Sequence, residues 1–376
     1  MVYVSAAGMV RVGRHYGKSI RDLAAEAVGE ALSKCSVDHV DYLVVSSALS
    51  YLQAPQLDLA SYIASELGVR VERTLTVEAG ESSGLAAIEV GVSLIRSGAA
   101  KRVLVVGADK MTEYASNPTY AQIQAVYDTE SDAFYNIGHA AEAAMLMRLY
   151  MSRYGVSRED LAYWPAMMHA HAKENPYAML RFAIDPAKVP GAMPLAEPIT
   201  LLDSYPLGDG AAAVLLMAED EHGDHMARIA AVASARGLPS MALRDDPLRI
   251  ESLEAVARML AGDPGQYDIV EVHDSFSILG ILALETLGLA PPGKAAELVR
   301  EGRFTVGGEG PVVNPGGGLK ARGHPFGATD VYKVAEVALQ LANEFPGLKV
   351  EGARRALVLS LNGLGSSARG VILESP

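Results

Sequence analysis

Short runs rich in branched apolar residues alternate with amphipathic repeats through the first hundred residues of the chain. The runs at 42–45, 74–77 and 103–107 are typical of parallel strands that are covered on both faces. Between them, residues 57–67 and 85–96 carry apolar positions at helical spacing. Strands that alternate with helices predict an α/β half with parallel strands and right-handed crossovers.

A first helix is predicted over residues 19–35, where one apolar stripe recurs three or four positions apart. The stripe consists of Ile20, Leu23, Ala24, Ala27, Val28, Ala31 and Leu32. Before it, residues 1–13 carry no basic segment followed by an apolar stretch and a small-residue cleavage site. We therefore interpret the N-terminal residues as a strand of the mature protein rather than an export signal.

The alternation of strands and helices resumes in the second part of the chain. Its predicted strands are 211–217, 228–235, 269–272, 356–361 and 370–373, and its predicted helices are 250–260, 276–287 and 329–341. Residues 111–200 interrupt this rhythm, with many tyrosines, histidines and methionines and a helix expected at 140–154. We therefore predict two similar α/β halves, formed by 1–110 with 201–235 and by 236–376, and a covering region at 111–200.

Charge and cysteine content exclude several classes of function. The chain has 32 basic and 45 acidic residues and a net charge of -13, which disfavours nucleic acid or an anionic membrane as a partner. Its most apolar stretch, 276–284, is ended by Glu285, far short of the roughly 20 residues that span a bilayer. Cys35 is the single cysteine, so the chain forms no internal disulfide and no cysteine-based metal site. We expect a cytoplasmic protein.

The sharpest local motif is NPGGGLKARGHPFGAT, residues 314–329. Five glycines around one His-Pro pair let the backbone approach closely and hold the His324 imidazole in a tight loop just before a helix. A lone histidine in a loop is usually structural or solvated. The glycines that surround His324 favour a functional interpretation instead.

This loop resembles the GHP loop of the thiolase superfamily. Three more segments resemble that family in its own order: HDSF at 273–276 is similar to the HDxF motif of sterol-carrier-protein-type thiolases, 198–213 to the segment that re-enters the sheet, and 154–178 to the covering loop. The resemblance implies an α/β thiolase fold. In that fold two similar βαβ-type halves form α-β-α-β-α layers under a covering loop domain.

The same resemblance implies acyltransferase chemistry, in which a carbon–carbon bond forms or breaks next to a coenzyme A (CoA) thioester. His324 takes the position of the family histidine that activates the nucleophile, and His273 takes that of the HDxF histidine. Two neutral imidazoles can donate hydrogen bonds to a thioester oxygen as it becomes enolate-like. Gly363 takes the position of a glycine whose backbone N–H completes a second oxyanion hole.

The nucleophile is where the sequence departs from the family. The segment VEAGESSGL at 77–85 resembles the family's nucleophile segment, with Glu81 in place of the cysteine. A carboxylate would form a reactive mixed anhydride, which puts cysteine-dependent thiolysis in doubt. Two interpretations of Glu81 remain open: an acid stabilised by the dipole of the following helix, or a carboxylate that acts as a base or mimics an acyl group. Cys35 ends the first helix and is expected to be structural.

The thiolase resemblance also implies where CoA binds. We expect Asn314, Gly317 and Gly318 to contribute the loop that meets the CoA thioester. Lys320 and Arg322 either contact a CoA phosphate or lie on a solvated basic surface. The CoA thioester is expected as substrate or ligand, with no covalently bound cofactor.

No metal site is predicted from the sequence. His169 and His171 form an HxH pair, but no convincing acidic or cysteine partner is near them in the sequence. We assign both histidines to the covering region.

Two classes of function remain open from the sequence. The first is an enzyme, either acyltransferase-like or a cysteine-independent aldolase or decarboxylase, and the second is a non-catalytic acyl-CoA-binding scaffold subunit of an acyl-transfer complex. The resemblance implies a homodimer or homotetramer. It also implies two separate partners, an OB-fold and zinc-ribbon protein that binds acyl-CoA and a 3-hydroxy-3-methylglutaryl-CoA synthase. We expect no nucleic-acid or membrane partner.

Overall fold

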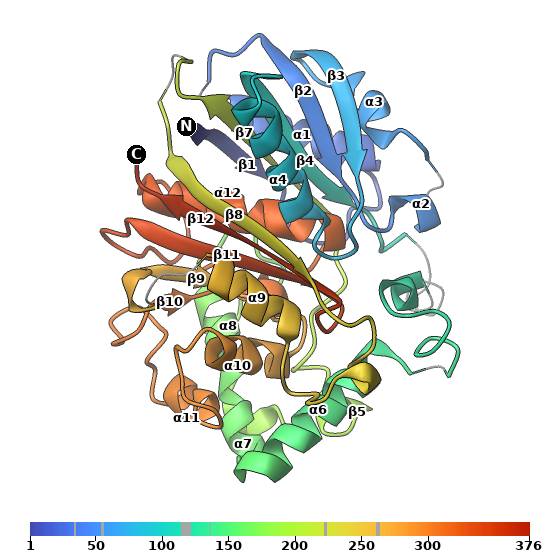
Figure 1. The fold of residues 1–376 in the computed structure, drawn as a ribbon, viewed down its shortest axis with the longest axis vertical. Helices are drawn as coiled ribbons and strands as arrows, with labels where there is room; N and C mark the ends of the chain where they lie inside the picture. The colour runs from blue at the N-terminus through green and yellow to red at the C-terminus, as the bar shows by residue number, and fades with distance from the viewer. Residues whose placement is uncertain (34, 54–55, 114–121, 136, 222–223, 261–263) are drawn as a thin grey trace.

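A computed structural model describes residues 1–33, 35–53, 56–113, 122–135, 137–221, 224–260 and 264–376. Ten strands form one sheet in the order β10-β9-β11-β12-β8-β1-β7-β4-β2-β3. This order consists of two five-strand halves that meet where β1 lies beside β8 (Figure 1). The expectation of two similar α/β halves in a thiolase-type fold is confirmed.

The first half has the strand order β3-β2-β4-β7-β1. β2 runs parallel to both β3 and β4, and β7 runs antiparallel to both β4 and β1. The strands are β1 (Val2–Met9), β2 (His39–Ser46), β3 (Arg70–Val77), β4 (Arg102–Asp109) and β7 (Gly210–Ala218). β3 is the end strand of the sheet and is largely exposed, which corrects our expectation that it is covered on both faces.

The second half repeats this pattern in the order β10-β9-β11-β12-β8. β9 runs parallel to β10 and β11, and β12 runs antiparallel to β11 and β8. The strands are β8 (Ala227–Arg236), β9 (Ile269–Glu271), β10 (Val312–Val313), β11 (Arg355–Asn362) and β12 (Ser367–Glu374).

We predicted a boundary at residue 235 that places β8 in the first half. Strand pairing corrects this placement, because β8 pairs with β12 along its length but with β1 only at Tyr3 and Val4. The domain boundaries themselves stay a prediction.

Helices cover both faces of each half. α4 (Ser83–Arg96) and α12 (Thr329–Leu341) contact each other and strands of both halves, so they form the central layer. α1 (Ile20–Leu32) and α3 (Leu59–Ala64) pack on the outer face of the first half, and α9 (Glu251–Met259) packs on β8 and β12. The predicted α-β-α-β-α layering is therefore observed (Figure 1).

The first helix begins with a capping box at Ser19. The Ser19 side chain accepts a hydrogen bond from the Asp22 backbone N–H, and the Asp22 carboxylate accepts one from the Ser19 backbone N–H. The predicted apolar stripe is buried from Leu23 to Ala31. The helix ends at Leu32, earlier than the predicted end at residue 35.

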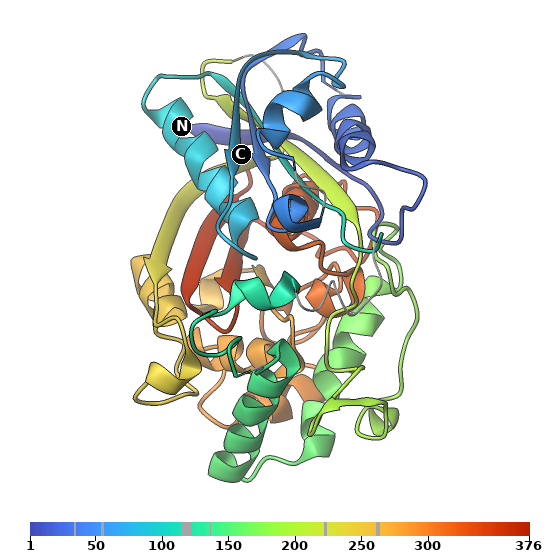
Figure 2. The ribbon, with the colours of Figure 1, turned by 90° about the vertical axis from the view of Figure 1, so that its right-hand side faces the viewer.

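The covering region lies against the second half of the fold and appears in green in both views (Figure 2). The predicted helix at 140–154 is confirmed as α6 (His139–Tyr154). Two further helices, α7 (Arg158–Leu161) and α8 (Tyr163–Ala172), were not predicted. α8 buries residues on nearly every side, so its sequence has no amphipathic period.

The remaining described elements are short, except for α10, which packs beside α9 and α6. They are α2 (Ser50–Gln53), α10 (Ser277–Thr286), α11 (Ala295–Arg300), β5 (Pro194–Ala196), β6 (Ile199–Thr200), η1 (Gln124–Val126), η2 (Pro186–Lys188), η3 (Met241–Leu243), η4 (Pro264–Gln266), η5 (Gly318–Arg322) and η6 (Phe326–Ala328). Among the described residues, no helix is long and apolar enough to cross a membrane.

Candidate active site

The four residues predicted to carry the chemistry come together between the two halves. Glu81 lies just before α4, His273 follows β9, His324 precedes α12, and Gly363 follows β11. The side chains of Glu81, His273 and His324 are buried. Helix N-termini and strand ends meet at this point, as they do at many α/β sites.

The Glu81 carboxyl is held by two groups of the site. Its Oε1 lies 2.9 Å from His324 Nε2, and its Oε2 accepts a hydrogen bond from the Gly363 backbone N–H at 2.7 Å. The backbone N–H of Glu81 donates to Asn362 Oδ1 at 3.0 Å. The carboxyl points into the site and lies just before the N-terminus of α4, so both interpretations of Glu81 stay open.

A glycine before Glu81 makes this arrangement possible. Gly80 has φ +60°, and a Cβ atom on it would lie 1.8 Å from Asn362 Oδ1. The backbone therefore approaches the Asn362 side chain as closely as only glycine permits. This close turn directs the Glu81 N–H toward Asn362 and the Glu81 carboxyl toward His324.

Burial raises the pKa of Glu81 to about 8. The Gly363 N–H and the nearby Lys333 ammonium lower this pKa, while the Asp330 carboxylate raises it further. A carboxyl with a pKa of about 8 exchanges protons readily near neutral pH, which is what a general acid or base requires.

The His324 ring is fixed on both of its nitrogens. His324 Nδ1 lies 2.6 Å from Thr329 Oγ1, and Nε2 faces Glu81. The ring stacks on Phe326 with centroids 4.4 Å apart and meets the edge of Tyr205 at 4.9 Å. Burial and nearby cations hold the pKa of His324 well below its usual value, so the imidazole is neutral.

His273 supplies an imidazole that is free to bind a ligand. Its ring lies 5.5 Å from the His324 ring, centroid to centroid, and nearly perpendicular to it. Neither ring nitrogen of His273 has a hydrogen-bond partner among the described residues. Burial, Lys333 and His324 hold the pKa of His273 well below its usual value. A buried, neutral and unpartnered imidazole can donate a hydrogen bond to a substrate oxygen.

Glu81, His273 and His324 also form a group that could hold a metal ion. One ligand atom from each residue lies within 4.8 Å of the other two. A carboxylate and two neutral imidazoles suit zinc and other transition metals. Both carboxyl oxygens of Glu81 already have hydrogen-bond partners in the protein, whereas His273 has none among the described residues. The expected absence of a metal stays a prediction.

The predicted CoA-binding loop packs against Val272 and Asp274, the residues on either side of His273 in the chain. Asn314 Oδ1 accepts a hydrogen bond from the Val272 N–H at 2.7 Å, and Asn314 Nδ2 has no partner among the described residues. Gly318 has φ +59°, and a Cβ atom there would lie 2.5 Å from Asp274 Oδ2. At Gly317 a Cβ atom would lie 2.5 Å from Ala172. These glycines allow the loop to pack closely, and contact with CoA stays a prediction.

Lys320 and Arg322 lie inside the protein rather than on a basic surface. Arg322 Nη1 bonds the Glu336 carboxylate at 2.8 Å, and both side chains are buried. Burial lowers the pKa of Lys320 to about 8. The solvated-surface interpretation is therefore wrong for both residues. The ion pair gives Arg322 a partner within the protein, and contact of Lys320 or Arg322 with a CoA phosphate stays a prediction.

Other residues considered from the sequence lie elsewhere or have structural contacts. Cys35 packs at the edge of the cluster under α1 and α3, and burial raises the pKa of its thiol. His169 Nδ1 lies 2.9 Å from the Phe182 carbonyl oxygen, and His171 Nδ1 lies 3.1 Å from that of Val313.

Sequence reasoning missed several residues that hold the site together. Thr329, Asn362 and Tyr205 each contact a predicted site residue, and Asp330 and Lys333 lie behind Glu81. Asn362 and Gly363 stand next to each other as a turn signal, which could have indicated Asn362. Thr329 lies only five residues after His324, whereas the contacts of Tyr205, Asp330 and Lys333 depend on packing between segments far apart in the sequence.

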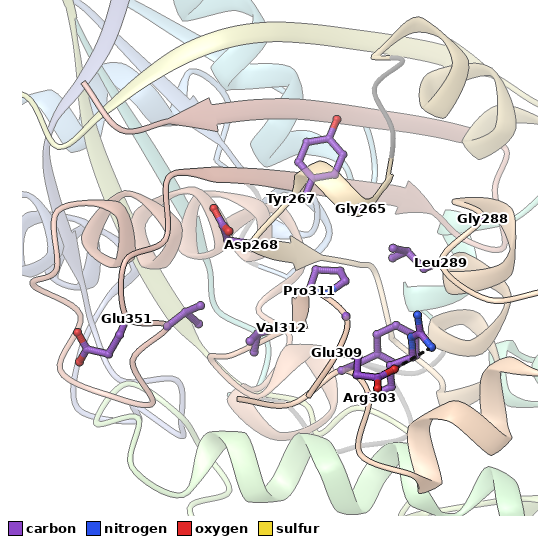
Figure 3. A pocket seen from close by; sticks show the side chains of 13 residues that line it. Gly265, Tyr267, Asp268, Gly288, Leu289, Arg303, Glu309, Pro311, Val312 and Glu351 are labelled. Carbon is purple, nitrogen blue, oxygen red and sulfur yellow. Dashed lines mark ion pairs between the residues drawn. The ribbon is translucent and has the colours of Figure 1, made fainter. Parts of the chain in front are cut away.

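Two cavities differ in their relation to this site. One of about 540 Å³ is lined in part by Gly80 and Asn362, the neighbours of Glu81 and Gly363 in the chain. The other, of about 440 Å³, lies beside β10 and is lined by residues such as Tyr267, Asp268 and Arg303 (Figure 3). None of the predicted site residues lines the cavity in Figure 3.

Solved structures share this fold over the whole chain. The structure described as "Ltp2-ChsH2(DUF35) aldolase" matches with a TM-score of 0.83 and 21% identity, covering 100% of this chain and 97% of that chain. Human mitochondrial 3-ketoacyl-CoA thiolase in complex with CoA matches with a TM-score of 0.75 and 19% identity, covering 100% and 98%. At these identities the similarity concerns the fold.

Curated relatives are more similar in sequence. An acetyl-CoA acetyltransferase of Methanothermobacter thermautotrophicus is 35% identical, with 98% of this chain and 97% of that protein aligned. Benzoylsuccinyl-CoA thiolase subunit BbsB of Thauera aromatica is 29% identical, covering 98% and 96%. Sterol carrier protein 2 of Oryctolagus cuniculus is 29% identical, covering 98% of this chain and 70% of its own length.

Family models match both parts of the chain. The model "Thiolase, N-terminal domain" matches residues 2–194, and "Thiolase C-terminal domain-like" matches residues 248–375. The matched ranges contain Glu81 in the first part and His273, His324 and Gly363 in the second. With the strand order, the two-histidine site and a relative at 35% identity, these matches show that the chain belongs to the thiolase family.

Proposed function

We propose that this chain makes or breaks a carbon–carbon bond next to a CoA thioester without forming an acyl-enzyme. The observation that carries the proposal is the position of the Glu81 carboxyl, between His324 Nε2 and the Gly363 N–H. The family relationship supports an acyltransferase-like enzyme that uses a CoA thioester. The missing cysteine favours a reaction of the aldolase or decarboxylase kind.

In the proposed reaction, Glu81 moves a proton and the histidines stabilise an enolate. In the synthetic direction, the Glu81 carboxylate takes a proton from the carbon next to the thioester, and the C–H electron pair moves toward the thioester oxygen. His273, whose ring nitrogens have no partner among the described residues, donates an N–H to the developing oxyanion. The His324 nitrogen that faces Glu81 Oε1 shares its N–H with this oxyanion as Glu81 becomes neutral. The enolate carbon then attacks a carbonyl carbon, and protonated Glu81 returns its proton to the new alkoxide. Cleavage is the same sequence in reverse.

Exchange of the acyl α-hydrogen tests this proposal without knowledge of the second substrate. Acetyl-, butyryl- and octanoyl-CoA are incubated with the protein in D₂O, and deuterium at the α-carbon is followed by mass spectrometry. We expect the native protein to accelerate exchange on at least one thioester. Glu81→Gln should reduce this rate at least about hundredfold, because the amide cannot take the proton.

Glu142→Gln is the matched control for this experiment. Burial raises the pKa of Glu142 to about 8 as well, but Glu142 lies on α6 in the covering region. Its replacement should leave the exchange rate within about twofold of the native rate, because Glu142 interacts with Asp132 and Arg244 rather than with a residue of the proposed site. Native protein that exchanges no faster than buffer on any of the three thioesters would refute the proposal.

A second candidate function is a non-catalytic acyl-CoA-binding scaffold. Both Glu81 oxygens are bonded within the protein, as an acyl group would be in an occupied site, and this observation favours the scaffold. One relative is described as a thiolase subunit. Binding of acyl-CoA without α-hydrogen exchange would support this second function.

We further propose that the chain is cytoplasmic and forms a homodimer or homotetramer. The exposed end strand β3 and exposed apolar side chains near it, Tyr51, Leu57, Tyr62 and Leu75, favour a subunit contact on that side. Light scattering of the purified protein should give at least twice the mass of the 39.7 kDa chain. A monomer at micromolar concentration would contradict this proposal.

We also propose protein partners, an OB-fold and zinc-ribbon acyl-CoA-binding protein and a 3-hydroxy-3-methylglutaryl-CoA synthase. The description "Ltp2-ChsH2(DUF35) aldolase" names a second component beside the thiolase-fold chain, which supports a partner of the first kind. Mass spectrometry of material purified with the tagged chain from its native cells identifies such partners. Recovery of the homo-oligomer alone would count against both.

A further inference from the structure

The first turns of α12 contact the segments that carry Glu81, His324 and Gly363. We propose that Asp330 and Lys333, which form a buried ion pair there, are positioning residues that place Glu81 against its hydrogen-bond donors and balance its charge. This inference rests on the proposed role of Glu81 as the group that moves the proton. No contact of Asp330 or Lys333 with a substrate is part of it.

Lys333 connects α12 to the strand that ends at Gly363. Its Nζ donates to the Leu359 carbonyl oxygen at 2.8 Å and lies 3.3 Å from Asp330 Oδ1. Leu359 is in β11, three residues before Asn362. Since Asn362 and Gly363 both bond Glu81, the Lys333 contact fixes the strand that supplies these groups.

Asp330 connects α12 to the helix that follows Glu81. Asp330 Oδ2 accepts a hydrogen bond from the Leu85 backbone N–H at 3.3 Å, in the first turn of α4. The helices touch closely here, since a Cβ atom on Gly84 would lie 2.8 Å from Asp330 Cβ. Thr329, the residue before Asp330, holds His324. One helix end therefore sets the relative position of Glu81, His324 and Gly363.

The two charges also act on Glu81 with opposite signs. Lys333 lowers the pKa of Glu81 and Asp330 raises it. Both side chains are buried, where neither water nor salt screens them well. A pair of apolar side chains could pack between these segments, but it would leave a Glu81 carboxylate without a nearby cation.

Besides Asp330, the charged groups that act on Lys333 are Arg322, Asp274 and Glu271, and the first two have partners of their own. Arg322 is paired with Glu336, and Asp274 accepts hydrogen bonds from the Leu319 N–H and the Trp164 indole. Glu271 on β9 has no hydrogen-bond partner among the described residues, and burial raises its pKa to about 8. The groups that face Glu81 are His273, His324, the Gly363 N–H, Asp330 and Lys333.

The test measures the titration of Glu81 directly. The carbonyl stretch of a protonated carboxyl is followed by infrared difference spectroscopy from pH 5 to pH 10, and Glu81→Gln identifies the Glu81 band. The variants are Lys333→Met, Asp330→Asn and the double variant. Lys333→Met keeps the length of the side chain and Asp330→Asn keeps its shape. The double variant leaves no unpaired charge, so it covers the case in which a single variant does not fold.

We expect the two single variants to move the titration in opposite directions. Lys333→Met should raise the pKa of Glu81 by about one unit and Asp330→Asn should lower it by about one unit, as expected for charges within a few ångströms. The double variant should stay within about half a unit of the native value. The pH profile of α-hydrogen exchange should move in the same directions.

Two results would overturn the positioning role. One is a Glu81 titration that none of the folded variants changes. The other is a shift in the same direction for both single variants, which general loosening of the structure would produce. The infrared titration needs no turnover. Opposite shifts in a protein that exchanges no hydrogen would keep the positioning pair and refute the proposed function alone.

Discussion

The Glu81→Cys variant is expected to gain thiolysis, converting acetoacetyl-CoA and free CoA into two molecules of acetyl-CoA. A cysteine at this position would lie before the N-terminus of α4 and beside His324, two features that favour a thiolate. The thiolate attacks the 3-keto carbon, the C2–C3 bond breaks, and acetyl-CoA leaves after protonation of its α-carbon. Free CoA then takes the acetyl group from the cysteine.

Chromatography of the CoA species measures this gain. We expect Glu81→Cys to form acetyl-CoA at a rate roughly a hundredfold or more above that of the native protein. A thiolate is a far stronger nucleophile than a carboxylate. Glu81→Ser is the matched control and should stay inactive, since a hydroxyl at this position is a weak nucleophile. If the native protein forms acetyl-CoA at the rate of the cysteine variant, our proposal that the reaction has no acyl-enzyme is wrong.

The His324→Ala variant is expected to lose the proposed reaction almost completely. The imidazole both contacts the Glu81 carboxyl at 2.9 Å and supplies an N–H near the reacting thioester in the proposed mechanism. Removal of one such donor typically costs a factor of about 10² to 10³. Because the Glu81 contact is lost in the same variant, we expect a decrease of about 10³ in the α-hydrogen exchange rate.

A second histidine variant separates this effect from loss of structure. His225 bonds Ser5 and stacks on Tyr3 near the start of β1, so His225→Asn should keep native exchange. Circular dichroism and thermal unfolding establish that both variants fold. A folded His324→Ala protein with native exchange rates would remove His324 from the site.

The main architecture was predictable because strands and helices leave a period in the sequence. The runs at 42–45 and 103–107 became β2 and β4, and the stripe from Leu23 to Ala31 became the buried face of α1. The prediction failed where packing hides that period. α8 is buried on nearly all sides, and β3 is exposed although its sequence resembles that of an internal strand.

The partner of a strand was also not predictable from local patterns. β8 follows β7 in the chain, and we placed it in the first half, but it pairs along its length with β12. A strand's own sequence specifies its alternation of faces, whereas its neighbour depends on which edge remains free after the rest of the sheet has formed.

For the site, the sequence by itself determined which residues to consider. Glycines around His324, the HDSF segment at 273–276 and the segment around Glu81 are visible in the chain, and they predicted a thiolase-like site with Glu81 in it. Tertiary structure alone decided what those residues touch. It placed Gly363 and His324 on the two oxygens of Glu81, buried Arg322 against Glu336, and put Asp330 and Lys333 behind the site. These contacts join residues up to 282 positions apart, and burial sets their pKa values, so no local pattern could specify them.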